Sequence, residues 1–158
     1  IDTVLGGRAP ELGDVRALEY TTMTIKEAMR LYPAAYSIAR VPVRDDHFEG
    51  YRIPAGAAVL ASPYVTHRHP RHWDAPAQFD PERFTPEREK ARHRYAYFPF
   101  GGGPRACIGQ YFSMLEAVLI VARLVQAFEV TTTERAVPLA TGITLRPAAA
   151  MPASVTLR

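Results

Sequence analysis

Cysteine is almost absent from this sequence of 158 residues, which contains Cys107 alone. A single cysteine cannot form an intrachain disulfide, so cysteine pairing does not indicate the redox compartment. It also cannot supply the several thiolate ligands of a structural zinc site or of a cysteine-bound iron–sulfur cluster. Any metal that Cys107 binds would therefore have a single thiolate ligand from this chain.

Long apolar runs are also lacking. The most apolar stretch extends from Ala117 to Ala122 between Glu116 and Arg123, and it is far too short to span a bilayer. The chain begins with Ile1 and shows no signal-peptide pattern. We therefore expect a cytoplasmic location, and a membrane anchor upstream of Ile1 stays open.

Lysine is scarce as well, because Lys26 and Lys90 are the only two among 19 basic residues. The abundance of arginine and alanine indicates a GC-rich bacterial source. A net charge of +3 is too small to indicate a nucleic-acid partner when no motif supports one. With 47% hydrophobic and 22% charged residues, the composition excludes a disordered or fibrous protein and is typical of a globular domain.

Hydrophobic patterning predicts a mixture of helices and short strands. Apolar residues at helical spacing predict a helix from Leu18 to Leu31, which ends because the residue before Pro33 avoids the α region. Asp14 is a candidate N-cap of a short helix. The remaining segments, in chain order, are a loop over 1–13, short strands over 36–62, an irregular segment with one helical turn over 63–99, a helix over 107–127 and short strands over 130–158.

The helix predicted over 107–127 is apolar around most of its circumference, with Glu116 and Arg123 as exceptions. A helix of this kind is normally buried on all sides in a large core. A chain of 158 residues can hardly surround it. The pattern therefore predicts that further structure packs against this helix.

The segment from Phe100 to Gly109 suits a cysteine that binds haem iron. Cys107 would begin the helix, where free N–H groups and the helix dipole favour thiolate over thiol. The glycines let the backbone turn tightly and pass close to a flat macrocycle. Arg105 can pair with a haem propionate, while Phe100 would shield the sulfur and Gly109 would keep the first helical turn clear of the porphyrin.

Two other interpretations of this segment stay open on the residues alone. Cys107 can be a small buried hydrophobe at the start of a core helix. A phosphate-binding loop is less favoured, because the Gly-Lys-Ser/Thr ending that it requires is absent.

The spacing Phe-x-x-Gly-x-Arg-x-Cys-x-Gly resembles the haem-binding signature of the cytochrome P450 family. Phe100, Gly103, Arg105, Cys107 and Gly109 fill all its fixed positions. The resemblance implies that Cys107 is the axial ligand of the iron of haem b. It also implies that the helix after Cys107 is the long proximal helix of the family.

Two further motifs carry the same resemblance. Lys-Glu-Ala-Met-Arg-Leu-Tyr-Pro, with Glu27 and Arg30, is similar to the Glu-x-x-Arg helix, and Pro-Glu-Arg-Phe is similar to the motif that supplies Arg83. Residues three apart on a helix share a face and can pair. The resemblance implies a buried structural triad of Glu27, Arg30 and Arg83, which locks the meandering segment against the helix and positions the cysteine loop.

The resemblance extends from about Asp14 to Arg158 and implies an α+β, mostly helical fold. This is the C-terminal part of the P450 fold: the Glu-x-x-Arg helix, a small β-sheet, the meander, the cysteine loop, the proximal helix and a C-terminal β-hairpin. Residues 1–158 would form a single partial domain without the N-terminal part and its distal helix, and without a fused reductase at the C-terminus. The implied contacts also include a propionate for Arg40 and substrate for Ala34, Ala35, Tyr36, Ile38, Thr141 and Ile143.

The implied function is that of a haem-thiolate monooxygenase, which activates O2 to hydroxylate or epoxidise an apolar organic substrate. A separate electron donor, such as a ferredoxin or a flavoprotein reductase, would supply electrons. We expect residues 1–158 alone to be inactive. The alternatives are a peroxide-dependent or isomerase haem-thiolate enzyme of the same fold, and a truncated, non-catalytic haem-binding domain.

Two other features have simpler interpretations. His67, His69 and His72 are interrupted by arginine and proline, so we do not expect them to converge on a metal ion. The charged stretch from Glu87 to Arg94 is typical of a solvated loop. The alternative is a docking patch for an acidic electron-transfer partner, with Arg92 and Arg94 as its charges.

Overall fold

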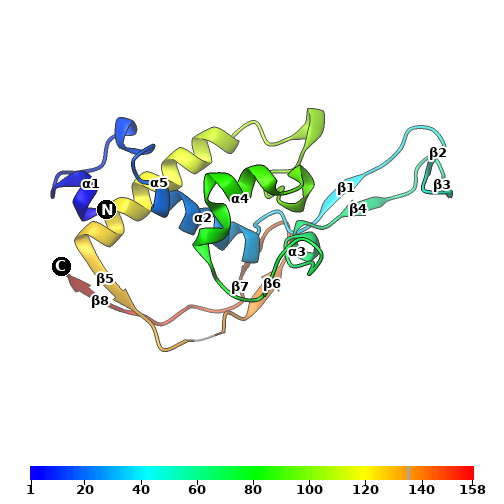
Figure 1. Cartoon of the computed structure of the whole chain (residues 1–158). Coiled ribbons are helices and arrows are strands. Elements are labelled where there is room, and N and C mark those ends of the chain that lie inside the picture. The colour runs from blue at the N-terminus through cyan, green and yellow to red at the C-terminus, as the bar shows by residue number, and fades with distance from the viewer. Residues whose placement is uncertain (135) are drawn as a thin grey trace.

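The computed structural model describes residues 1–134 and 136–158, and it combines helices with short antiparallel strands (Figure 1). The α-helices are α1 (Asp2–Leu5), α2 (Glu19–Leu31), α3 (Pro63–Thr66), α4 (Pro86–Ala91) and α5 (Gln110–Ala127). The 3₁₀ turns are η1 (Leu12–Asp14), η2 (Pro81–Phe84), η3 (Arg94–Ala96) and η4 (Gly103–Arg105). The strands are β1 (Ile38–Arg40), β2 (Asp46–Phe48), β3 (Tyr51–Ile53), β4 (Val59–Ala61), β5 (Phe128–Thr131), β6 (Leu139–Thr141), β7 (Leu145–Pro147) and β8 (Ser154–Leu157).

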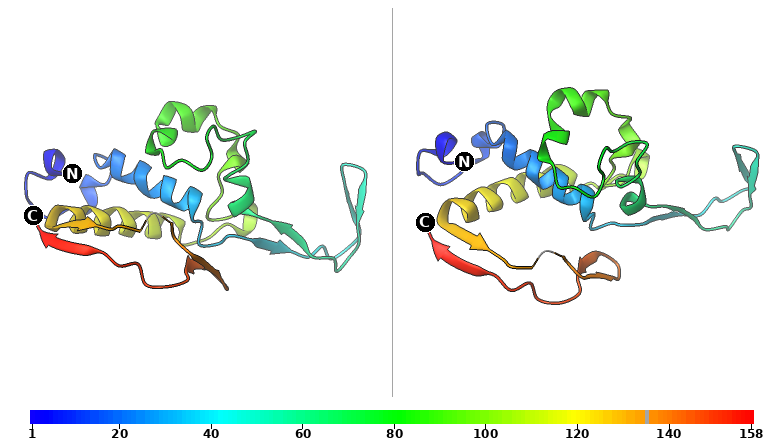
Figure 2. Two further views of the ribbon diagram at one scale, coloured as in Figure 1. Left: turned by 90° about the horizontal axis from the view of Figure 1, so that it is seen from below. Right: turned by 60° about the horizontal axis from the view of Figure 1, so that its bottom comes forward.

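The two long helices, α2 and α5, lie side by side and form the first core (Figure 2). Leu18 and Ile25 pack against Val118 and Ala122. Burying an aliphatic side chain of this size contributes roughly 1.5–3 kcal/mol relative to leaving it exposed. The helix predicted from Leu18 to Leu31 is therefore confirmed, and its apolar face packs on α5.

A second core lies on another face of α2, under the segment that joins α3 to the cysteine loop. It consists of Met23, Trp73 and Phe84, with Tyr97 packed at its margin. The indole Nε1–H of Trp73 donates to the carbonyl of Ala96 at 3.2 Å, so the ring is fixed by packing and by a hydrogen bond. This core attaches the irregular segment to α2.

The segment over 63–99 contains more helix than the single turn predicted from its sequence. It includes α3, η2, α4 and η3, and three of these begin with proline. Proline suits the first helical position, because the N–H that it lacks would have no partner there. Ser62 and Asp80 supply the side-chain caps of α3 and η2. The pairs Ser-Pro and Asp-Pro were therefore start signals that periodicity alone missed.

The strands form four separate antiparallel pairs, β1–β4, β2–β3, β5–β8 and β6–β7. The β2–β3 hairpin extends away from the helices, at the end of the β1–β4 pair (Figure 1). The predicted C-terminal hairpin corresponds to β6–β7, while β5 and β8 bring the end of α5 next to the C-terminus. Within the stretch 36–62, where short strands were predicted, β1 ends at Arg40 before Pro42, which has no N–H to donate.

Two predicted helix starts were wrong. Asp14 ends η1 and caps no α-helix; its carboxylate accepts the Glu11 N–H and pairs with Arg8, which holds its pKa at about 2. The helix predicted from Cys107 begins at Gln110, with Gly109 as its N-cap. The loop predicted over 1–13 also contains α1 and part of η1.

The helix α5 buries only a narrow face in this chain. Val118 and Ala122 are its buried residues. Large apolar side chains on its other faces are exposed, namely Tyr111, Phe112, Ile120, Leu124 and Val125. No helix among the described residues is long and apolar enough to cross a membrane.

Candidate functional site

The cysteine loop is a tight turn closed by backbone hydrogen bonds. Gly101 and Gly103 adopt the left-handed region, with φ of 76° and 70°. The Gly101 N–H donates to the Phe98 carbonyl, and the Cys107 N–H donates to the Phe100 carbonyl, each at 2.9 Å. These two bonds hold the cysteine backbone against the start of the loop.

Cys107 lies three residues before α5, so it does not begin the helix as predicted. Its thiol is exposed, and a Cβ placed on Gly109 would lie 3.8 Å from the sulfur, which is an ordinary contact. The sulfur thus stays beside the N-terminal end of α5, where partial positive charge gathers. The interpretation of Cys107 as a buried hydrophobe is wrong for this chain.

The surroundings of the thiol fit an apolar macrocycle with anionic substituents. Ile108, directly after Cys107, is fully exposed, and Phe112 is exposed in the first turn of α5. The Arg105 side chain, two residues before the sulfur, is exposed as well. These groups fit a haem: the sulfur can bind the iron, the apolar side chains can contact the macrocycle, and the guanidinium can pair with a propionate.

A groove of about 410 Å³ adjoins the loop and brings Arg40 to it. Its lining includes Ile38 and Arg40 from β1 and Phe98 and Gly102 from the loop. A Cβ on Gly102 would lie 2.7 Å from the Tyr95 ring, so the backbone passes close to that ring. The structure therefore places Arg40 and the cysteine loop around one groove, although the two are far apart in sequence.

The two segments predicted to contact substrate meet in the structure. The Tyr36 hydroxyl donates to the Gly142 carbonyl at 3.0 Å, and the Leu145 N–H donates to the Ala34 carbonyl at 2.9 Å. Ile143, at the tip of the β6–β7 hairpin, is fully exposed. Of the other residues in this prediction, Ala35 and Ile38 are half-buried and Thr141 is exposed.

The charged residues Glu27, Arg30 and Arg83 come together between α2 and η2. Glu27 and Arg30 are fully buried and Arg83 is 8% exposed. Arg30 donates from Nε to Glu27 Oε2 at 2.7 Å and from Nη2 to Oε1 at 2.8 Å. Arg83 Nε lies 3.5 Å from Glu27 Oε1 and makes an ion pair without a hydrogen bond. Burying one carboxylate among two guanidiniums is tolerable only with such close pairing.

Backbone carbonyls complete this cluster, and sequence reasoning did not identify them. Arg30 also donates to the carbonyls of His67 at 2.8 Å, Pro76 at 2.8 Å and Gln78 at 3.0 Å. One guanidinium thereby fixes three points of the irregular segment to α2. No residue type marks these positions, because any residue offers a carbonyl.

Residues 1–151 match the family model described as cytochrome P450. This chain belongs to the cytochrome P450 family. Cyclooctatin synthase of Streptomyces melanosporofaciens is 47% identical to this chain over 124 residues, which are 78% of this chain and 27% of that protein. Cytochrome P450 4V2 of Rattus norvegicus is 38% identical over 151 residues, 93% of this chain and 29% of that protein.

Solved structures agree with the assignment to the P450 fold. The crystal structure of the cytochrome P450DA heme domain matches with a TM-score of 0.91 and 31% identity, over 99% of this chain and 35% of that one. The chain thus spans about a quarter to a third of the P450 proteins that it matches. The match covers the helices as well as the strands of this chain.

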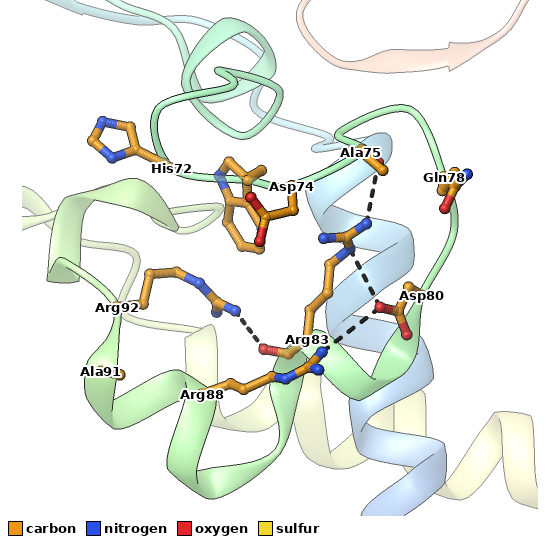
Figure 3. A pocket seen from close by; sticks show the side chains of 10 residues that line it. His72, Asp74, Ala75, Gln78, Asp80, Arg83, Arg88, Ala91 and Arg92 are labelled. Atoms are coloured by element: carbon orange, nitrogen blue, oxygen red, sulfur yellow. Dashed lines mark hydrogen bonds and ion pairs between the residues drawn. The ribbon is translucent and has the colours of Figure 1, made fainter.

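Residues 72–92 of this P450 chain line an open pocket of about 510 Å³ that is rich in arginine (Figure 3). Arg83 Nη2 donates to the Ala75 carbonyl at 3.1 Å, and Arg88 lies 3.8 Å from Asp80. Arg92 donates to the Arg83 carbonyl, and its guanidinium lies 4.1 Å from the centre of the Trp73 ring. These contacts contradict the interpretation of Arg92 as a free docking charge, because the side chain is half-buried and stacked.

The histidines of the P450 chain separate into one buried and two exposed residues. His67 is fully buried, and its Nε2 accepts the Phe98 N–H at 2.9 Å. His69 and His72 are exposed, with ring centroids 5.7 Å apart. Within residues 1–134 and 136–158, no group of three or more His, Cys, Asp or Glu is arranged to hold a metal ion.

Replacing Gly101 with alanine should strain the cysteine loop of the P450 chain. Because φ is 76° at this position, an L-residue there costs about 1–2 kcal/mol. We expect urea unfolding to reveal that loss of stability. Gly142→Ala is the matched control, since a Cβ there meets nothing within 4 Å; equal stability of the two variants would contradict the strain argument.

Proposed function

We propose that the complete protein containing this chain is a haem-thiolate monooxygenase with Cys107 as the sulfur ligand of the iron. The observation that carries the proposal is the exposed thiol of Cys107, held by a two-glycine turn directly before α5. The family membership of the chain supports it. The chain spans about a quarter to a third of the length of the P450 proteins that it matches. We propose that further sequence, with a distal helix, supplies the rest of the enzyme.

The residues around the loop have separate parts in this proposal. Cys107 provides the sulfur, and the N-terminal end of α5 complements its negative charge when it is bound to iron. Arg105 and Arg40 hold the propionates, each as a guanidinium facing a carboxylate. Phe100 limits the access of water to the sulfur, and Gly103 and Gly109 keep the backbone free of side chains there.

When bound, the haem supplies activation of O2, and a thiolate ligand favours cleavage of the O–O bond. The chain's own contribution is to orient the cofactor and the substrate. We propose an apolar organic substrate that is hydroxylated or epoxidised, with Ala34 to Ile38 and Ala140 to Ile143 contacting it. The hydrogen bond from Tyr36 to Gly142 supports this placement, because it fixes the two segments to each other.

We propose that a separate electron donor, such as a ferredoxin or a flavoprotein reductase, supplies the electrons. We also propose that the protein is bacterial and cytoplasmic. Residues 1–158 alone are not expected to catalyse oxygen insertion. The Glu27, Arg30 and Arg83 cluster is assigned a structural role, since the three side chains pair with one another and all three residues are buried.

The carbon monoxide difference spectrum of the reduced complete protein tests the assignment. We expect the red-shifted Soret band of thiolate-bound iron in the wild type and its complete loss in Cys107→Ala. Ala106→Ser is the control, because it changes the neighbouring exposed residue without touching the sulfur. A thiolate band that persists in Cys107→Ala would disprove the ligand assignment.

A further inference from the structure

His67 connects the buried charge cluster of α2 to the cysteine loop. Its backbone carbonyl accepts Arg30 Nη1 at 2.8 Å, and its ring Nε2 accepts the Phe98 N–H at 2.9 Å. The residue is fully buried at the C-terminal cap of α3, where its own N–H donates to Pro63 at 2.8 Å. His67 therefore contacts the charge cluster through its backbone carbonyl and the segment before the cysteine loop through its ring.

The His67 ring packs against two aromatic rings. Its centroid lies 5.1 Å from that of Tyr97 and 5.3 Å from that of Phe98, the latter edge to face. Burial, with the charges of Arg30 and Arg68 nearby, lowers the ring pKa to about 4. The imidazole is therefore neutral near pH 7. Since Nε2 accepts a hydrogen bond, the ring proton is assigned to Nδ1, which is buried and has no hydrogen-bond partner among the described residues.

The hydrogen bonds continue from Phe98 to the cysteine. Phe98 receives its support from His67 at its N–H, and its carbonyl in turn accepts the Gly101 N–H at 2.9 Å. Gly101 opens the left-handed turn, and the Phe100 carbonyl accepts the Cys107 N–H at 2.9 Å. One path from Arg30 to the Cys107 backbone therefore runs through His67, by these hydrogen bonds and the covalent backbone between Phe98 and Gly101.

We propose that His67 is a positioning residue that fixes the cysteine loop, and with it the sulfur ligand, relative to the α2 charge cluster. The inference rests on the proposed haem ligation by Cys107. The sequence gave no indication of this role, because His67 lies in a histidine stretch that is interrupted by arginine and proline. Its acceptor nitrogen, rather than its bulk alone, is the feature that the role requires.

Substitutions at His67 separate the acceptor from the bulk. His67→Phe fills the same space with a ring that cannot accept the Phe98 N–H. In His67→Gln, the terminal amide oxygen lies at the same number of bonds from Cα as Nε2 and can still accept it. Tyr97→Phe is the matched control, since it deletes the 3.0 Å hydrogen bond from Tyr97 to the Lys26 carbonyl, which also ties this segment to α2.

The test uses the complete haem-loaded protein and measures two quantities for each variant. The first is the ratio of thiolate-bound to non-thiolate iron in the reduced carbon monoxide spectrum, and the second is the Tm. We expect His67→Phe to lower the ratio by about threefold to tenfold, the effect of one lost neutral hydrogen bond. His67→Gln should restore most of it. Tyr97→Phe should lower the Tm and leave the ratio unchanged.

An unchanged ratio in His67→Phe would overturn the proposal. The proposal would also fail if Tyr97→Phe lowered the ratio as much as His67→Phe, because the effect would then be general destabilisation. If His67→Phe does not fold, His67→Leu provides the same comparison with a smaller side chain. If the wild type shows no thiolate band, the proposed function fails and the proposed role of His67 fails with it. If the wild type shows the band and His67→Phe leaves the ratio unchanged, only the role of His67 fails.

Discussion

Glu27→Ala is expected to lower the free energy of unfolding by about 3–5 kcal/mol, the cost of breaking a buried charge pair from one side. Glu27 is fully buried and accepts two hydrogen bonds from Arg30 and one, at 2.9 Å, from the Asp80 N–H. Without the carboxylate, Arg30 and Arg83 would be left as neighbouring buried cations. Urea unfolding of the complete protein measures the change.

Loss of haem content should accompany this destabilisation, since Arg30 also fixes the carbonyls of His67, Pro76 and Gln78. Glu116→Ala is the control, because Glu116 is exposed on α5 and such substitutions usually stay within about 0.5 kcal/mol. A change below about 1 kcal/mol in Glu27→Ala would mean that the carboxylate is not needed to hold the two arginines.

Trp73→Ala is the second substitution with a large expected effect, a loss of about 3–5 kcal/mol. The Trp73 side chain is 2% exposed and packs with Met23 and Phe84 in the second core. Its ring lies under the guanidiniums of Arg30, at 5.0 Å, and Arg92, at 4.1 Å. Removing the indole ring leaves a cavity in the second core. The guanidiniums of Arg30 and Arg92 also lose the aromatic face on which they stack.

The matched control for Trp73 is Phe79→Ala, in the same segment of the chain. Phe79 is 51% exposed, so truncating it should have a much smaller effect on the denaturation midpoint. Limited proteolysis of the meander would give an independent measure, with faster cleavage in Trp73→Ala. Equal midpoints for the two variants would show that the second core does not hold this segment.

The local elements were the part of the fold that could be predicted from sequence. The helix α2 was evident from apolar periodicity, and the pairing of Glu27 with Arg30 followed from their spacing of three. The cysteine loop was evident because glycine at Gly101 and Gly103 meets a backbone requirement that other residues meet poorly. Helix starts were harder to predict. The helix expected to begin at Cys107 begins three residues later, at Gln110, because an apolar run does not show which residue caps the helix.

Contacts between distant segments were not predictable from local patterns. Arg92 looked like a solvated charge, yet it stacks on Trp73. His67 was considered only as part of a histidine stretch that was not expected to hold a metal, yet it accepts the Phe98 N–H in the interior. In both cases the partner lies on another element, so no spacing along the chain encodes the contact.

The sequence by itself determined the identity and order of the chemical groups: one thiol in a glycine turn, a carboxylate and a guanidinium on one helix face, and a third charge in Pro-Glu-Arg-Phe. These follow from backbone preferences and helical spacing, which act over a few residues. Only the tertiary structure decided which carbonyls Arg30 holds, how His67 supports the cysteine loop and how Arg40 reaches the same groove. The physical reason is that burial and hydrogen-bond satisfaction depend on segments far apart in sequence, and these meet only when the whole core forms.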